Sequence, residues 1–180
     1  MDRSLEEQRM YAQVREIIGG NAERITRGIL EAIRLRSDTW HYLDVSDDVA
    51  QARIFRVVED MQVRLGIWLA KGQPESTLFA SYSNLGADRC QEGIPLEETT
   101  LVFLLIKREI WKIFRDQIVP GSRISLIEFV EINYYLNLFF DRIIQSTIAG
   151  YQNEQALIAV KHRRAKDLSG RAPARAGQCG

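Results

Sequence analysis

Two neighbouring stretches between 93 and 148 constrain the fold most, because each predicts a helix that is apolar on more than one side. In the first, the run 101–106 is entirely apolar, and further large apolar side chains follow it. In the second, apolar residues recur from 124 to 148 with so few polar gaps that the middle turns have no solvent face. A surface helix of a small monomer needs only one apolar stripe, so these helices must be covered twice. We expect one cover to be the domain's own core and the other to be a second copy of the chain.

The rest of the chain shows helical periodicity broken by short turns. Apolar residues at three- and four-residue spacing predict helices over 5–18, 22–35, 46–71, 74–91, 95–117 and 122–162. Asn21 and Ser46 are expected to cap two of these helices, and 37–45 is expected to be a connecting loop. No segment has the two-residue alternation of a strand. The sequence therefore predicts one all-α domain of about six helices over 1–162.

The last helix is unusually long. If 122–162 is unbroken, it spans roughly 60 Å at 1.5 Å per residue, so its second half should project from the body. The segment 163–180 is rich in Arg, Ala, Gly and Pro, and we expect it to be a disordered basic tail. Such a tail can touch nucleic acid, which would make the protein a DNA-binding regulator, but a solvated end is the favoured interpretation.

Composition narrows the function classes. Lysine plus arginine equals aspartate plus glutamate at 24 each in 180 residues, so no overall field attracts nucleic acid or an anionic membrane. The two cysteines, Cys90 and Cys179, lie far apart, which fits a reducing compartment rather than a disulfide framework. The N-terminus lacks the apolar run of a signal peptide, and no segment has ~20 uninterrupted apolar residues. We expect a cytoplasmic protein without a membrane span.

The side chains that usually carry chemistry are scarce. The chain has two histidines, His41 and His162, which offer too few partners for a metal site or a histidine-based catalytic pair. Cys90 on a predicted helix is best explained as a small core residue. We therefore expect neither an enzyme nor a resident cofactor.

One motif carries a resemblance to a known family. The segment 85–98, Leu-Gly-Ala-Asp-Arg-Cys-Gln-Glu-Gly-Ile-Pro-Leu-Glu-Glu, is followed by Leu-Leu-Ile-Lys-Arg-Glu-Ile-Trp over 104–111. Together they resemble the N-terminal sensory domains of the RsbT co-antagonist (RsbRD-type) family, found in bacteria on stressosome proteins and ahead of histidine kinases. The resemblance implies a role in bacterial signal transduction, in stress responses, with a protein partner in the pathway.

The same turn is similar to that of globin-coupled sensors, whose haem-binding histidine would correspond to Arg89. A guanidinium has no lone pair to give iron, so this likeness implies a globin-like fold that has lost haem. The alternative is a haem-binding or small-ligand-binding sensor, in which His41 would be the internal ligand. In both families the last two helices typically pair across a two-fold axis.

Our leading hypothesis is a non-catalytic, haem-free homodimeric sensor built on 95–117 and 122–162. A small apolar ligand or a partner protein would act at a pocket near Arg89, Cys90 and Arg108, and the projecting helix would transmit the change. We expect Phe139→Asp to dissociate the dimer. The expected interface residues are Trp111, Phe114, Tyr135, Phe139, Phe140 and Ile143.

Overall fold

The computed structural model describes residues 5–42, 44–71, 75–117 and 125–169, and every regular element in these residues is a helix. The order is α1 (Leu5–Gly20), α2 (Ala22–Arg34), the 3-10 segment η1 (Ser37–Tyr42), α3 (Asp47–Lys71), α4 (Glu75–Gln91), α5 (Leu96–Asp116) and α6 (Leu126–Ser169). The prediction of an all-α fold with six helices and a long last helix is therefore confirmed.

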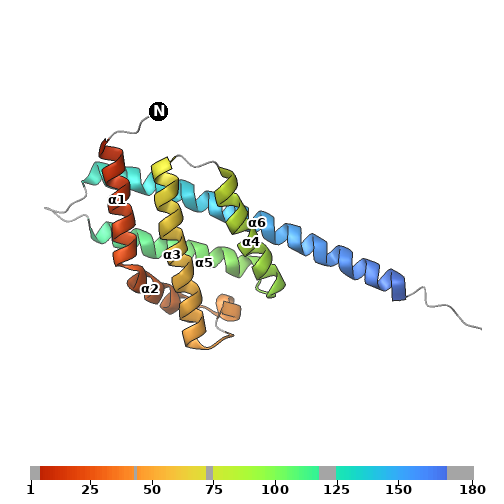
Figure 1. Ribbon diagram of the computed structural model, residues 1–180. Helices are drawn as coiled ribbons and strands as arrows, with labels where there is room; N and C mark the ends of the chain where they lie inside the picture. Colours follow the sequence, from red (N-terminus) through yellow and green to blue (C-terminus); the bar gives the residue numbers. More distant parts are fainter. Residues whose placement is uncertain (1–4, 43, 72–74, 118–124, 170–180) are drawn as a thin grey trace, which may run out of the picture.

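The helices form two crossing layers. In Figure 1, α1 and α3 run side by side on the near face, and α5 and α6 cross behind them. The second half of α6 leaves the body and continues alone. With 44 residues, α6 is about 66 Å long at 1.5 Å per residue, far longer than the other helices.

The last helix ends later than its sequence pattern indicates. It continues to Ser169, so 163–169 is helical where the sequence predicts the start of a disordered tail. Positive side chains do not interrupt a helix that is already nucleated, and lysine, arginine and alanine all have high helix propensity. The remainder of that predicted tail, 170–180, lies outside the described residues.

Asn21, between α1 and α2, does not cap α2 as the sequence predicts. Asn21 makes no side-chain cap hydrogen bond to α2. Its amide instead donates to the carbonyl oxygen of Ile17 at 2.8 Å, and its backbone N–H donates to Ile18 at 3.2 Å. Asn21 therefore satisfies free carbonyl groups at the end of α1.

The segment expected to be a loop at 37–45 contains the helical turn η1. Thr39 is fully buried, and its hydroxyl donates to the carbonyl oxygen of Ile33 at 2.9 Å. Tyr42 is also buried in the core. These two inward-facing side chains fix η1 against the end of α2.

The turn between α4 and α5 has the hydrogen bonds of a Schellman motif. The N–H of Ile94 donates to the carbonyl oxygen of Arg89 at 3.0 Å, and that of Gly93 donates to Cys90 at 3.2 Å. Gly93 has a φ of 74°, which a residue without a side chain adopts at no steric cost. Ile94 is buried after the turn, and this places the end of α4 against the start of α5.

Candidate functional site

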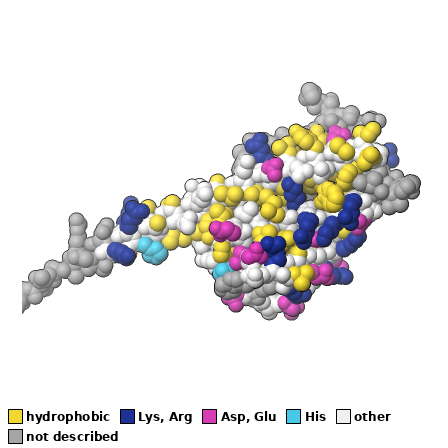
Figure 2. Space-filling model, turned by 180° about the vertical axis from the view of Figure 1, so that it is seen from behind, with side chains coloured by type: hydrophobic (Ala, Val, Ile, Leu, Met, Phe, Trp, Pro, Cys, Tyr) yellow, Lys and Arg dark blue, Asp and Glu magenta, His cyan; other side chains and the backbone are white. Residues whose placement is uncertain are grey.

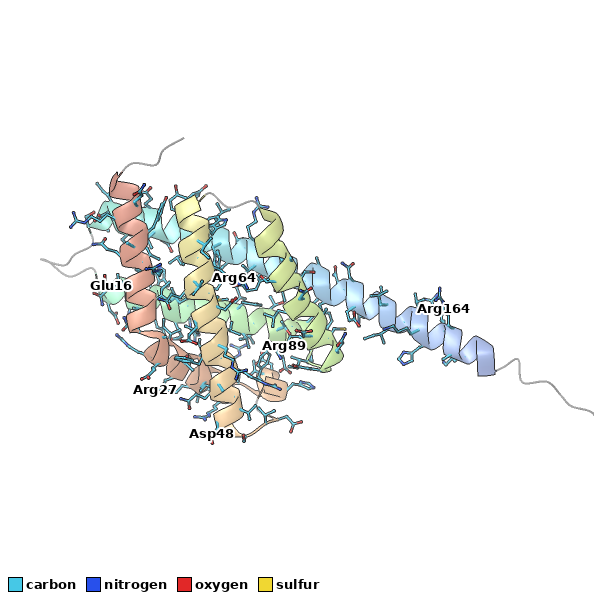
Figure 3. All side chains as sticks on the ribbon, viewed as in Figure 1. Glu16, Arg27, Asp48, Arg64, Arg89 and Arg164 are labelled. Carbon is cyan, nitrogen blue, oxygen red and sulfur yellow. The ribbon has the colours of Figure 1, made fainter. Side chains whose placement is uncertain are left out.

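A small cavity lies among η1, α3, α4 and α5, beside the side chain of Arg89. Its volume is about 20 Å³, and its walls are mostly apolar. Figure 3 shows Arg89 near the C-terminal end of α4, on the side toward α3. The lining residues are Tyr42, Arg53, Ile54, Val57, Leu85, Arg89, Thr99, Val102, Phe103 and Ile106.

Arg89 closes this cavity and connects α4 to η1. Its side chain is only 12% exposed and forms an ion pair with Glu92. Its guanidinium carbon lies 5.9 Å from the centre of the Tyr42 ring, within the range of a cation–π interaction. Burial raises the pKa of the Tyr42 hydroxyl, and the positive charge of Arg89 partly opposes that rise.

A second polar contact joins η1 to α5. The buried carboxylate of Glu98, which is 5% exposed, accepts a hydrogen bond from Nδ1 of His41 at 2.5 Å. The other carboxylate oxygen of Glu98, Oε2, is buried and has no hydrogen-bond partner. His41 therefore joins η1 to the first turn of α5, and it does not line the cavity.

Haem does not fit this site. A volume of about 20 Å³ holds about one water molecule, far less than a flat macrocycle needs. The guanidinium of Arg89 has no lone pair to give iron. His41, the alternative ligand considered from the sequence, lies outside the cavity with its Nδ1 bonded to Glu98.

The three residues expected to share a signal pocket have different surroundings. Arg89 faces the cavity, while Arg108 lies on the exposed side of α5 and bonds Glu109 at 3.3 Å. Cys90 is partly buried, and burial together with the nearby Glu154 raises the pKa of its thiol. The structure does not bring Arg108 or Cys90 to the cavity that Arg89 lines.

A larger feature is an open groove between α5 and α6, with a volume of about 410 Å³. Figure 2 views the molecule from behind and shows hydrophobic side chains gathered on this face. The groove is lined by Leu104, Lys107, Arg108, Trp111, Asn133, Leu136 and Asn137.

Exposed apolar side chains also form a ridge along the first turns of α6. Three of its side chains recur at helical spacing and are strongly exposed: Ile127 (81%), Val130 (61%) and Tyr134 (62%). Leu126 beside them is 67% exposed. We call Ile127, Val130 and Tyr134 the α6 ridge.

Most of the residues expected at a dimer interface lie inside the chain. Four of them are at most 1% exposed: Phe114, Phe139, Phe140 and Ile143. Tyr135 is half-buried, with edge contacts to the rings of Tyr11 and Trp68. Trp111 is the most exposed of the set, at 38%, and it lines the groove.

The sequence does not separate the inner and outer faces of α5 and α6. The inward stripe of α6 and the α6 ridge have the same three- and four-residue spacing, so periodicity alone cannot assign them. Asn133 and Asn137 are the available signal, since amides are rarely placed in a core. Both line the groove and bond each other, with Nδ2 of Asn137 3.2 Å from Oδ1 of Asn133.

The part of the chain that the structure describes has neither a metal-binding cluster nor a helix able to span a membrane. No group of three or more His, Cys, Asp or Glu side chains is arranged to hold a metal ion there. Among the helices of that same part of the chain, none has the length and apolar character needed to cross a membrane.

Comparisons with known proteins agree with the fold. Two crystal structures of the globin domain of E. coli DosC, one ferric and one ferrous, superpose with a TM-score of 0.62 at 14% and 15% identity. Each alignment covers 77% of this chain and 87% of the other. This confirms the globin-like fold expected from the resemblance. The comparison with curated proteins found no match.

A family model matches most of the chain. The model of the RsbT co-antagonist protein rsbRD N-terminal domain matches residues 19–166. That range includes the cavity, the α4–α5 turn and the groove described above. The resemblance seen in the motif at 85–111 is confirmed, and the chain belongs to the RsbT co-antagonist protein rsbRD N-terminal domain family.

Proposed function

We propose that this protein is a non-catalytic sensory domain of a signalling pathway that works as a haem-free homodimer. Its family is named for a co-antagonist, a protein that acts by changing the activity of another protein. Its globin-like fold supplies a core between α3, α4 and α5 where a signal can be received. The output would pass to a protein partner.

The α5–α6 face carries the proposal of a homodimer. The side chains of the α6 ridge are strongly exposed, and α6 also supplies part of the lining of the groove, so the ridge and the groove are neighbours on one helix. A two-fold pairing needs a patch that is complementary to itself, and a ridge beside a groove meets that requirement. Exposed apolar side chains gathered in this way typically mark an interaction site. We infer that the ridge of each copy packs into the groove of the other.

The proposal that the protein is haem-free rests on the size of the cavity and on the chemistry of Arg89. The space beside Arg89 holds about one water molecule. In the resemblance to globin-coupled sensors, Arg89 corresponds to the haem-binding histidine, and a guanidinium cannot bind iron. A small molecule, or a partner that displaces Arg89, would act there instead. The purified protein mixed with haem should show no Soret band of a ligated haem, whereas such a band would overturn this part of the proposal.

Light scattering at micromolar concentration tests the homodimer directly. We expect twice the mass of one chain. A mass equal to one chain, unchanged at the highest soluble concentration, would rule out the homodimer and leave only a sensor acting through a different partner.

A further inference from the structure

The helices of the body divide into two groups by how they pack. α4 packs far more extensively on α6 than on any other element, and it touches α5 only slightly. The helices α1, α2, α3 and α5 pack chiefly among themselves. We call α4 with α6 the stalk unit, and α1, α2, α3 and α5 with η1 the base unit. The first half of α6 also packs on α5, on α1 and, through the ring of Trp68, on α3, and these contacts join the two units.

The stalk unit is held by backbone against backbone. A Cβ atom on Gly86 of α4 would lie 2.0 Å from the carbonyl oxygen of Thr147 on α6. A Cβ atom on Gly150 of α6 would lie 1.9 Å from the carbonyl oxygen of Ser83 on α4. Glycines on both helices therefore permit a crossing so close that neither helix can slide over the other without separating.

A further contact between α4 and α6 lies at the point where α6 leaves the body. Nε2 of Gln91, at the end of α4, donates to Oε1 of Glu154 on α6 at 2.9 Å. The hydroxyl of Thr147 donates to the carbonyl oxygen of Ile143 in its own helix at 2.8 Å, so this hydroxyl is not left unpaired at the crossing. Any displacement of α4 is thereby passed to α6 where it leaves the body (Figure 1).

The opposite side of α4 is packed imperfectly against the base unit. The cavity lies here, between Leu85 and Arg89 of α4 and the residues of α3, α5 and η1. Tyr82, one turn earlier, is 2% exposed, and its hydroxyl has no hydrogen-bond partner. Figure 3 shows Arg64 and Arg89 along this side of α4. An unfilled space and an unpaired hydroxyl both forfeit interaction energy, so α4 is held less firmly on this side than at its crossing with α6. We call this interface between α4 and the base unit the seam.

We propose that the stalk unit moves as a rigid body against the base unit along this seam, and that Arg89 holds the resting position through its contact with Tyr42. Sliding between packed helices is a common form of switching, because a packed interface has discrete alternative arrangements. The turn at Gly93 connects the two units with a left-handed residue. The inference rests on the proposed function for its output: α5 and α6 line the groove from different units, so the slide would reshape the dimer face.

Distances between pairs of spin labels test the motion in the full chain. With Cys90→Ser and Cys179→Ser as background, one pair of cysteines crosses the seam, at the exposed positions Glu23 and Gln155. The control pair lies within the stalk unit, at the exposed positions Asn84 and Asn153. Labelled chains diluted with unlabelled ones report distances within one chain, so the result does not depend on dimerisation.

The probes are two substitutions at the seam. Arg89→Ala removes the contact with Tyr42, and Val102→Phe fills the cavity beyond its volume of about 20 Å³. For either variant that still melts cooperatively, the distance across the seam should shift or broaden by several ångströms while the control distance stays unchanged.

Three outcomes would overturn the proposal. Equal change in both pairs means that the stalk unit is not rigid, and no change in either pair means that the seam does not slide. If neither variant folds, hydrogen exchange of the unsubstituted protein decides: α4 and the buried half of α6 should exchange at one common rate that differs from α2 and α3, and independent rates would contradict the rigid unit. If light scattering gives a monomer but the spin-label distance across the seam changes as expected, only the homodimer is ruled out and the sliding of the stalk unit stands.

Discussion

His41 Nδ1 lies 2.5 Å from Glu98 Oε1, and this contact ties η1 to the first turn of α5 across 57 positions of sequence. Glu98 is 5% exposed, whereas the His41 side chain is 28% exposed. Carboxylates near the N-terminus of a helix are stabilised by its dipole, which favours Glu98 at this position. The pair holds η1, and with it Tyr42, beside the cavity.

Removing His41 should leave the Glu98 carboxylate buried without its partner. We expect His41→Ala to lower the free energy of unfolding by about 1–3 kcal/mol, as measured by urea denaturation. In a Glu98→Gln background, His41→Ala should lower the free energy of unfolding by less, because the buried side chain that loses its partner is an amide and not a carboxylate. The double-mutant cycle should then give a coupling of about 1 kcal/mol. Additive effects of the two substitutions would show that the contact contributes nothing to stability.

The crossing of α4 and α6 should tolerate no side chain at its glycines. We expect Gly86→Ala to lower the free energy of unfolding by about 3 kcal/mol, because the new Cβ meets backbone atoms that cannot move aside. Gly20→Ala is the matched control, since a Cβ there has nothing within 4 Å, and it should raise stability by roughly 0.5 kcal/mol. Similar denaturation midpoints for both variants would contradict the close crossing.

A charge on the α6 ridge should dissociate the dimer without unfolding the chain. Val130→Asp places a carboxylate at a side chain that is 61% exposed in one copy, so the stability of the folded monomer should change little. Val63→Asp makes the same change on the outer face of α3, where the side chain is 54% exposed. Light scattering should give a monomer for the first and a dimer for the second. A dimer for Val130→Asp would exclude the ridge from the interface.

Phe139→Asp should unfold the chain, whereas the sequence alone predicts that it dissociates the dimer. Phe139 is 1% exposed and packs against the rings of Trp68 and Tyr82. A buried, unpaired carboxylate in this cluster costs an amount comparable to the whole stability of a small domain. We expect loss of the cooperative melting transition followed by circular dichroism. A folded monomer would show that the residue acts at a surface.

The buried hydroxyl of Tyr82 should make stability depend on alkaline pH. Burial raises its pKa well above the ordinary tyrosine value, so above a pH of about 10 the unfolded chain loses this proton while the folded chain keeps it. The unfolded state then binds fewer protons, and the free energy of unfolding falls as pH rises. Tyr82→Phe should remove this part of the fall and be neutral or stabilising by about 1 kcal/mol at pH 7. Parallel pH profiles for the two proteins would contradict it.

The sequence by itself determined the helices. Spacing of apolar residues fixed all six, the α4–α5 turn followed from its glycine and proline, and the motif at 85–111 identified the family. These features depend on neighbours within a few positions along the chain, so local propensity and periodicity carry them. The turn in η1 was missed because Thr39 owes its place to a hydrogen bond six residues back, at Ile33.

Only the tertiary structure decided which face of each helix is covered. Phe139 and Val130 both fit an apolar stripe of α6, yet one lies in the core and the other in water. The cavity at Arg89, the pairing of His41 with Glu98 and the contact of Gly86 with Thr147 join residues that are distant in sequence. Periodicity records that a face is apolar, but the partner that buries it is set by how whole helices cross, and that is a property of the packed chain.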